Sequence, residues 1–203
     1  MKQGSVRLKV WEIALLIAVV VCLASGAAAI QSQEQLSEKV VRLHVLANSD
    51  SEEDQALKLT VRDAVLEEAE RLLKRTENRG EAEGLLRGQL LELEQLANET
   101  VRNAGYEYPV TVELEEVEFP TRTYEGFSLP AGEYLALRVL IGEAAGRNWW
   151  CVVFPPLCTV AAAEFSEVAE DAGFSDAEIA LITEETAGYV VKFKLLEWIQ
   201  QCR

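Results

Sequence analysis

The fold is decided by the stretch Asn148-Trp-Trp-Cys-Val-Val-Phe-Pro-Pro-Leu-Cys158, in which apolar residues run without a charge into two prolines. Such a run predicts a buried strand that ends before Pro155, because proline cannot donate a ladder hydrogen bond. The alternation of side chains along a strand places Trp149 and Trp150 on opposite faces of the sheet. We expect both indoles in the core, since large apolar side chains are mostly buried, and an exposed aromatic patch is the alternative.

Residues 40–47 read Val-Val-Arg-Leu-His-Val-Leu-Ala and alternate in polarity. This pattern predicts a strand with one apolar face and a mixed face that carries Arg42 and His44. His44 is the single histidine of the chain. A lone histidine on a strand is more often a hydrogen-bonded structural residue than a catalyst, so we expect a structural role for it.

Two segments have the spacing of amphipathic helices. The first begins at the polar turn 48–54, whose serines and aspartate stand three residues before acids as in a capping box, and it continues to about Lys74. The second follows the polar break 76–80 and runs through Leu86 to a C-terminal cap at Gly105. We expect the two helices to form an antiparallel hairpin that covers a sheet.

Two further segments alternate in the way that strands do. Residues 108–119 change phase at Glu115, which indicates a β-bulge. After a loop at 121–132, residues 133–141 alternate again, and a turn at 142–147 leads into the opening stretch. This order predicts a three-stranded meander.

Together these elements predict an α+β fold. It is a two-layer sandwich in which the helical hairpin packs on a largely antiparallel sheet of about four strands. Residues 160–203 are expected to form a C-terminal tail with short helices, one of them capped by Ser175, and a short strand followed by a helix at 189–199.

The chain has 203 residues and a formal net charge of -15 at pH 7. This length suits one domain with a targeting segment and a tail. A surface of this charge repels nucleic acid and anionic lipid, so we expect no nucleic-acid partner. Aliphatic residues are abundant and Pro and Gly are few, which indicates a folded acidic domain and not a disordered acidic chain.

The first 29 residues have the layout of a signal peptide. Lys2, Arg7 and Lys9 precede an apolar run at 13–23, and a cluster of small residues ends at Ala29. We expect cleavage after Ala29 and export of the domain. An uncleaved transmembrane anchor is the alternative, because the apolar stretch is barely long enough to span a bilayer.

The sequence contains no convincing catalytic, cofactor-binding or metal site. His44 is the single histidine available as a base to Cys151, Cys158 and Cys202, so a Cys-His hydrolase stays an alternative. The Cys-x6-Cys spacing lies outside the usual range for zinc, and the turn 48–54 lacks the glycine and the last glutamate of a calcium loop. We therefore expect no cofactor, metal or small-molecule ligand.

A disulfide is predicted between Cys151 and Cys158. Thiols are oxidised outside the cytoplasm, and Cys22 would leave with the signal peptide, so three cysteines remain in the exported chain. The double proline must reverse the chain to bring the two Cα atoms within about 5 to 6 Å. A reduced, buried Cys151 and a pairing with Cys202 are the alternatives.

Four segments stand in one order along the chain, and they are Arg42-Leu-His-Val-Leu-Ala-Asn-Ser-Asp-Ser-Glu-Glu-Asp-Gln-Ala-Leu-Lys-Leu59, Phe119-Pro-Thr-Arg-Thr-Tyr124, Leu129-Pro-Ala-Gly-Glu-Tyr134 and the opening stretch. With these segments the chain resembles the stage II sporulation protein R family. The resemblance covers Val40 to about Thr159. Together with the signal-peptide layout, it divides the chain into a targeting segment or N-terminal membrane anchor (1–29), a linker (30–38), a sporulation protein R-like domain (39–159) and a variable tail with short helices (160–203).

The resemblance implies a signalling protein of endospore formation. Such a protein is made in the forespore and exported into the intermembrane space, where it is either free or tethered by an uncleaved N-terminal helix. There it switches on a mother-cell membrane protease, which processes the sigma-E precursor. The family supplies no catalytic residues, so the implied role is that of a ligand and not of an enzyme. A thiol-dependent extracytoplasmic hydrolase and an anchored structural protein of the cell envelope are the alternatives.

Receptor-contact residues are expected on two connections, since binding residues commonly lie on loops. The turn after the first strand offers Asn48 and Asp50, and the loop before the third offers Arg122 and Tyr124. The negative charge also predicts a basic patch on the receptor, with association that slows as salt rises.

Overall fold

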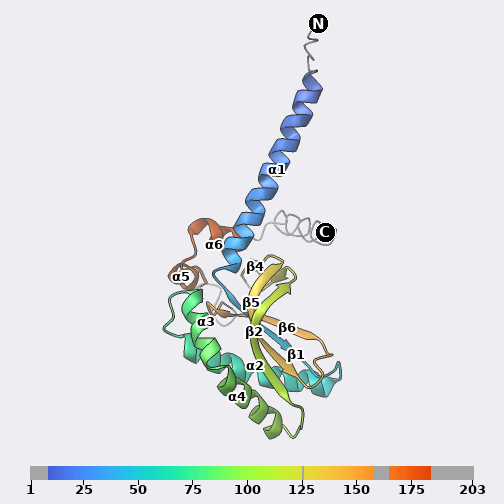
Figure 1. The fold of residues 1–203 in the computed structure, drawn as a ribbon, viewed down its shortest axis with the longest axis vertical. Helices are drawn as coiled ribbons and strands as arrows, with labels where there is room; N and C mark the ends of the chain where they lie inside the picture. Colours follow the sequence, from blue (N-terminus) through green and yellow to red (C-terminus); the bar gives the residue numbers. More distant parts are fainter. Residues whose placement is uncertain (1–8, 125, 158–164, 184–203) are drawn as a thin grey trace, which may run out of the picture.

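The structure, a computed structural model, describes residues 9–124, 126–157 and 165–183 (Figure 1). Its centre is a four-stranded sheet in the order β2-β5-β1-β6. The strands are β1 (Val41–Leu46), β2 (Val110–Phe119), β5 (Gly132–Ile141) and β6 (Asn148–Phe154). β5 is antiparallel to β2 and parallel to β1, and β6 is antiparallel to β1. The predicted α+β class with a largely antiparallel sheet is confirmed.

Three helices cover one face of this sheet, and they are α2 (Glu52–Leu73), α3 (Arg79–Gly88) and α4 (Leu90–Asn103). The predicted hairpin is present, but its second arm is divided between α3 and α4. Gln89 leaves helical geometry at the junction, with φ -116° and ψ 10°. Gly84 and Gly88 lower the helix propensity of the segment before the break, which is the physical reason for a division there.

The first core lies between these helices and the sheet. Val61, Val65 and Ala69 of α2 are fully buried against the apolar face of β1, which carries Val41, Leu43 and Val45. The helix begins as the polar turn predicts, because Ser51 is its N-cap and accepts a hydrogen bond from the Asp54 backbone N–H. The cap at the far end is also confirmed, since Gly105 has φ +86° and the Tyr106 N–H donates to the Val101 carbonyl, the bond that closes a helix C-terminus.

A second core lies on the opposite face of the sheet. It is built by the last turn of α1 (Val10–Ser37), the small hairpin of β3 (Arg122–Thr123) and β4 (Ser128–Leu129), α5 (Phe165–Asp171) and α6 (Asp176–Thr183). Leu36 at the end of α1 is fully buried there, with Phe127 and Phe165 stacked at 4.9 Å between ring centroids. The expected polar linker is therefore helical up to Ser37, and both faces of the sheet are partly covered.

The predicted meander is wrong, because β1 lies between β5 and β6. Every residue from Val41 to Val45 is buried, so this strand requires a hydrogen-bonded neighbour on each side and cover on each face. The turn at 142–147 accordingly crosses the end of β1. Its backbone binds there, with Gly146 N donating to Ala47 O at 2.9 Å.

The β-bulge predicted at Glu115 is also wrong. β2 pairs with β5 in one unbroken register from Val110 to Phe119. The apparent change of phase arises because the two ends of β2 bury opposite faces: Val112 contacts the first core and Phe119 the second. A strand longer than the helical layer can change its buried face without changing its register.

The two indoles lie on opposite faces as predicted, but the expectation that both are core residues is wrong. Trp149 is 38% exposed, and the guanidinium of Arg62 lies 4.2 Å from its ring centroid. Trp150 is half-buried on the other face. Both indoles sit near the start of an edge strand, where neither layer extends over them fully.

The sequence predicts a signal peptide at the N-terminus, with a membrane anchor as the alternative, and a mixed tail at the C-terminus. Within the described residues, no helix is both long and apolar enough to cross a membrane. In the tail, α6 has the predicted cap, because Ser175 and Glu178 exchange hydrogen bonds between side chain and backbone. The strand and helix expected at 189–199 lie outside the described residues.

We predict that Gly146→Ala destabilises the protein by about 2 kcal/mol or more, because a Cβ on this residue would stand 2.1 Å from the backbone oxygen of Ser49. Gly84→Ala is the matched control. A Cβ there meets nothing within 4 Å, and alanine favours the helix by about 0.5 to 1 kcal/mol. Urea unfolding of the two variants measures both effects, and equal midpoints would contradict the close approach.

Candidate functional site

The sheet face opposite the three helices carries a cluster of basic and aromatic side chains. We call it the aromatic face, and its members are Arg42, His44, Phe119, Tyr124, Tyr134 and Trp150. Alternation along β1 brings Arg42 and His44 to this side. Phe119 arrives from the end of β2, and Trp150 from β6, where it is paired in register with His44.

Arg42 is fully buried at the centre of the aromatic face. Its guanidinium carbon lies 4.0 Å from the ring centroid of Phe119 and 5.0 Å from that of Tyr134, which is a cation–π arrangement. Nη2 donates to the hydroxyl oxygen of Tyr124 at 2.5 Å. Within the described residues Arg42 has no ion pair, and its Nε and Nη1 have no hydrogen-bond acceptor. The ring faces therefore supply most of the stabilisation of this charge.

His44 lies under Trp150, with ring centroids 4.0 Å apart and planes inclined by 10°. Its Nε2 donates to the side-chain oxygen of Asn148 at 2.6 Å, so Nδ1 carries the lone pair of the neutral ring. Burial lowers the pKa of His44 below its ordinary value, the hydrogen bond with Asn148 opposes this, and the charges of Arg138 and Arg42 lower it further. His44 is accordingly a neutral structural residue at pH 7.

Arg122 is the solvent-exposed member of the neighbourhood. It lies on β3, and its guanidinium carbon stands 5.6 Å from the ring centroid of Trp150. Tyr124 follows this strand directly and stacks on Phe127 with centroids 4.8 Å apart. Two of the predicted receptor contacts, Arg122 and Tyr124, are therefore brought together on the rim of the aromatic face.

The other two predicted contacts lie in a separate network at the end of β1. Asn48 accepts a hydrogen bond from Glu143 N at 3.0 Å and donates to the carboxylate of Asp54 at 2.8 Å. Asp50 accepts from Arg147 N at 2.7 Å. Asn48 and Asp50 therefore fasten the turn at 142–147 to the start of α2, and no described contact joins them to Arg122 or Tyr124.

The sequence patterns did not identify Trp150 and Phe119 as partners of Arg42 and His44. One signal was present, because the mixed face of β1 needs a partner surface that accepts a cation. Aromatic rings from edge strands satisfy this requirement. What the local patterns lacked was the strand order that places β6 next to β1.

The geometry separates the two groups of the alternative Cys-His hydrolase. Cys151 is paired in register with Leu43, and its side chain, 4% exposed, lies in the first core under the helices. His44 lies on the opposite face of the same sheet. These two residues cannot form a catalytic dyad, because the sheet stands between their side chains. Cys158 and Cys202 lie outside the described residues.

Among the residues that are described, no cluster of three His, Cys, Asp or Glu side chains could hold a metal ion.

We predict that the free energy of unfolding decreases as pH falls below about 6.5, the ordinary pKa of histidine. In this window the unfolded chain binds a proton that folded His44 resists, because its folded pKa is lowered. His44→Gln should flatten the slope. The hydrogen bonds from Ser49 and Asn48 lower the pKa of Asp54. Protonation of Asp54 therefore changes the free energy of unfolding only at more acidic pH than this window. Urea unfolding at pH 7.5 and pH 5.5 tests this, and equal slopes for both proteins would refute it.

The disulfide between Cys151 and Cys158 stays a prediction, because Cys158 is not among the described residues. We expect non-reduced, exported protein to resist alkylation at both positions after denaturation. Peptide mass mapping measures this directly. Labelling of both thiols would exclude the pairing, and protection that involves Cys202 would indicate the alternative bridge.

Comparison with known proteins supplies the identity of the family. The family model of stage II sporulation protein R matches residues 37–164. The curated stage II sporulation protein R of Bacillus subtilis (strain 168) is 34% identical over 206 residues, which cover 91% of this chain and 92% of that protein. No solved structure matches the chain. The chain therefore belongs to the stage II sporulation protein R family.

Proposed function

We propose that this protein is an exported signal of endospore formation that activates a mother-cell membrane protease, which then processes the sigma-E precursor. Membership of the family supports a role in sporulation. The finer steps of export, receptor binding and protease activation are our proposal. The chain would act from the intermembrane space as a protein ligand and not as an enzyme.

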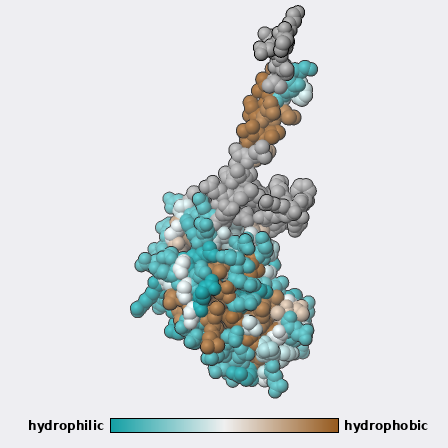
Figure 2. Space-filling model, viewed as in Figure 1, coloured by the Kyte–Doolittle hydropathy of each residue, from teal (hydrophilic) through white to brown (hydrophobic). Residues whose placement is uncertain are grey.

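The observation that carries the export step of the proposal is the exposed apolar surface of α1. Val10, Trp11, Leu15, Ile17 and Val20 are among its large apolar residues that project into solvent. Figure 2 shows this apolar segment standing clear of the largely hydrophilic domain. These apolar side chains of α1 are exposed and do not belong to either core of the domain. Such a segment is typical of an export signal, in which an N-terminal basic and apolar stretch directs secretion.

The aromatic face supports a binding role. Arg122 and Tyr124 lie on its rim, where polar and aromatic groups on a short hairpin are accessible to a partner. Arginine and tyrosine are enriched at the centres of protein interfaces. His44 and Cys151 lie on opposite faces, so this pair gives no support to the alternative hydrolase function.

The proposal is tested in a sporulating strain that lacks the gene. The wild-type chain should restore processing of the sigma-E precursor. Arg122→Gln should lower the rate of processing about fivefold or more, because a rim charge contributes to association. Arg102→Gln is the matched control, since Arg102 is an exposed arginine on α4, away from the aromatic face. Failure of the wild-type chain to restore processing would contradict the proposal.

The same strain distinguishes the ligand from the hydrolase. A folded His44→Gln protein should still signal, because an activator needs no proton transfer by this residue. Complete loss of signalling with normal secretion and stability would favour the hydrolase. With purified components, association with the protease should slow as salt rises, and association independent of salt would exclude electrostatic steering.

A further inference from the structure

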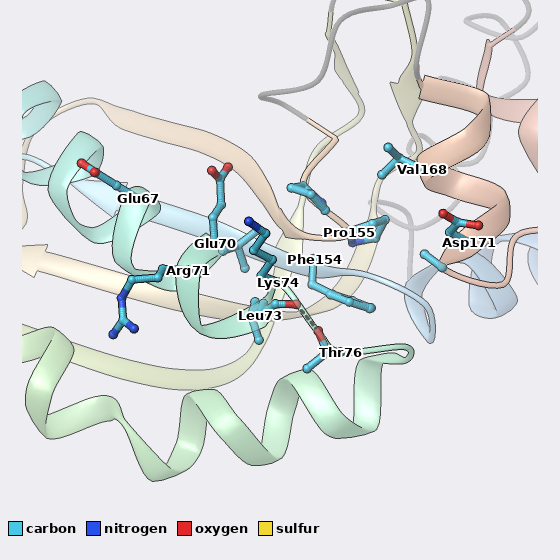
Figure 3. Close-up of a pocket in the computed structure, with 13 residues that line it drawn as sticks. Glu67, Glu70, Arg71, Leu73, Lys74, Thr76, Phe154, Pro155, Val168 and Asp171 are labelled. Atoms are coloured by element: carbon cyan, nitrogen blue, oxygen red, sulfur yellow. Dashed lines mark hydrogen bonds between the residues drawn. The ribbon is translucent and has the colours of Figure 1, made fainter.

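A hollow of about 540 Å³ lies between the C-terminal end of α2, the end of β6 and α5 (Figure 3). Its volume falls within the range of sites that bind small molecules or a few peptide residues. It lies where the two cores meet, because Val153 and Phe154 belong to the first core and Val168 and Ala172 pack against the second. The receptor contacts proposed at Arg122 and Tyr124 do not involve this hollow.

The floor and one wall of the hollow are apolar. Leu73, Val153 and Phe154 are buried side chains of the floor, and Pro155 continues it beyond the strand. Figure 3 shows Val168 on the α5 side of the hollow, and this residue is half-buried. Such a surface favours a bulky apolar side chain, because burying apolar area out of water is favourable.

The α2 wall carries an acidic group without a partner. The Oε1 atom of Glu70 is buried and has no hydrogen-bond donor among the described residues. Arg71, the adjacent base, is committed to Glu68 in an ion pair, and Lys74 is a second base on this wall, for which no ion pair is found among the described residues. The carboxylates of the lining outnumber the bases that remain, so the hollow stays acidic with Lys74 counted. Glu67 on α2 and Asp171 on α5 add negative charge on the two sides, as Figure 3 shows. A buried carboxylate oxygen without a donor is costly, and a bound cation would satisfy it.

We propose that this hollow is the docking site for an extended segment of the partner protein in which a lysine or arginine stands next to a bulky apolar residue. The cation would donate to Glu70, and the apolar side chain would pack on the half-buried Pro156 and Val168, above the buried floor. Charge complementarity selects this occupant, because the domain is strongly acidic and the Glu70 oxygen lacks a donor. The inference rests on the proposed function, since the partner is then the extracytoplasmic part of the membrane protease.

The test uses the full chain in the sporulating strain. Glu70→Lys should lower processing of the sigma-E precursor about tenfold or more, because it places a cation where the partner brings its own. Glu99→Lys changes the net charge equally on the exposed side of α4 and should leave processing within about twofold of wild type. Thermal unfolding of both purified proteins establishes that they fold.

A second measurement locates the contact. A photo-crosslinking residue in place of Ala172, which lines the hollow, should form a covalent product with epitope-tagged protease, whereas the same residue in place of Glu99 should not. The crosslink should be lost when Glu70→Lys is added. If Glu70→Lys folds and signals as well as Glu99→Lys, the docking inference fails and the proposed function stands. If the wild-type chain does not support processing, the proposed function itself fails.

Discussion

The structure depends on the complete burial of β1. This strand has a hydrogen-bonded neighbour along each edge and a core against each face, so all five residues from Val41 to Val45 leave water. Its apolar face is covered by α2. Its mixed face must also be covered, and its charged and polar side chains determine what can cover it. Aromatic residues from β2, β5 and β6 meet this need, which explains why Phe119, Tyr134 and Trp150 converge there.

Arg42 shows how this cover works energetically. A fully buried guanidinium costs several kcal/mol in desolvation, and in an acidic chain a carboxylate partner would be easy to provide. Within the described residues the contacts are instead the rings of Phe119, Tyr134 and, at 6.0 Å, Tyr124, together with the hydroxyl of Tyr124. Cation–π contacts contribute about 2 kcal/mol or more each when desolvated. Burial of its ring raises the pKa of Tyr134, which therefore stays neutral and keeps donating to the carbonyl of Pro130.

Local sequence signals predicted the helices and strands well, but they did not predict which strands lie side by side in the sheet. The caps at Ser51 and Gly105 and the strand end before Pro155 follow from short-range chemistry, so each could be located from a few residues. The position of β1 between β5 and β6 could not, because it depends on burial from both sides, and no pattern within one segment contains that information. The error at Glu115 has the same origin, since the change of buried face along β2 reflects where the helical layer ends.

The candidate site was predictable to a similar degree. Arg122 and Tyr124 were expected on a loop, and the structure places both on the rim of the aromatic face. Asn48 and Asp50 were expected on a turn, and their side chains bind the backbone of a second turn. Sequence alone does not separate these cases, because a polar side chain on a connection serves a partner or the chain itself equally well. Only the acceptors and donors nearby distinguish the two roles.

The strand β6 joins the two surfaces to which we assign binding. Trp150, near its start, stacks on His44 in the aromatic face, and Val153 and Phe154, at its end, form the floor of the hollow beside α5. The irregular pairing opposite Val41 and Arg42 gives the end of the strand its own orientation, so that Phe154 joins the first core and not the face of Trp150. A substitution within β6 would therefore disturb both surfaces and the pairing of β1 together. Side chains on the helices and on β3, such as Glu70 and Arg122, change one surface at a time because they lie outside the sheet.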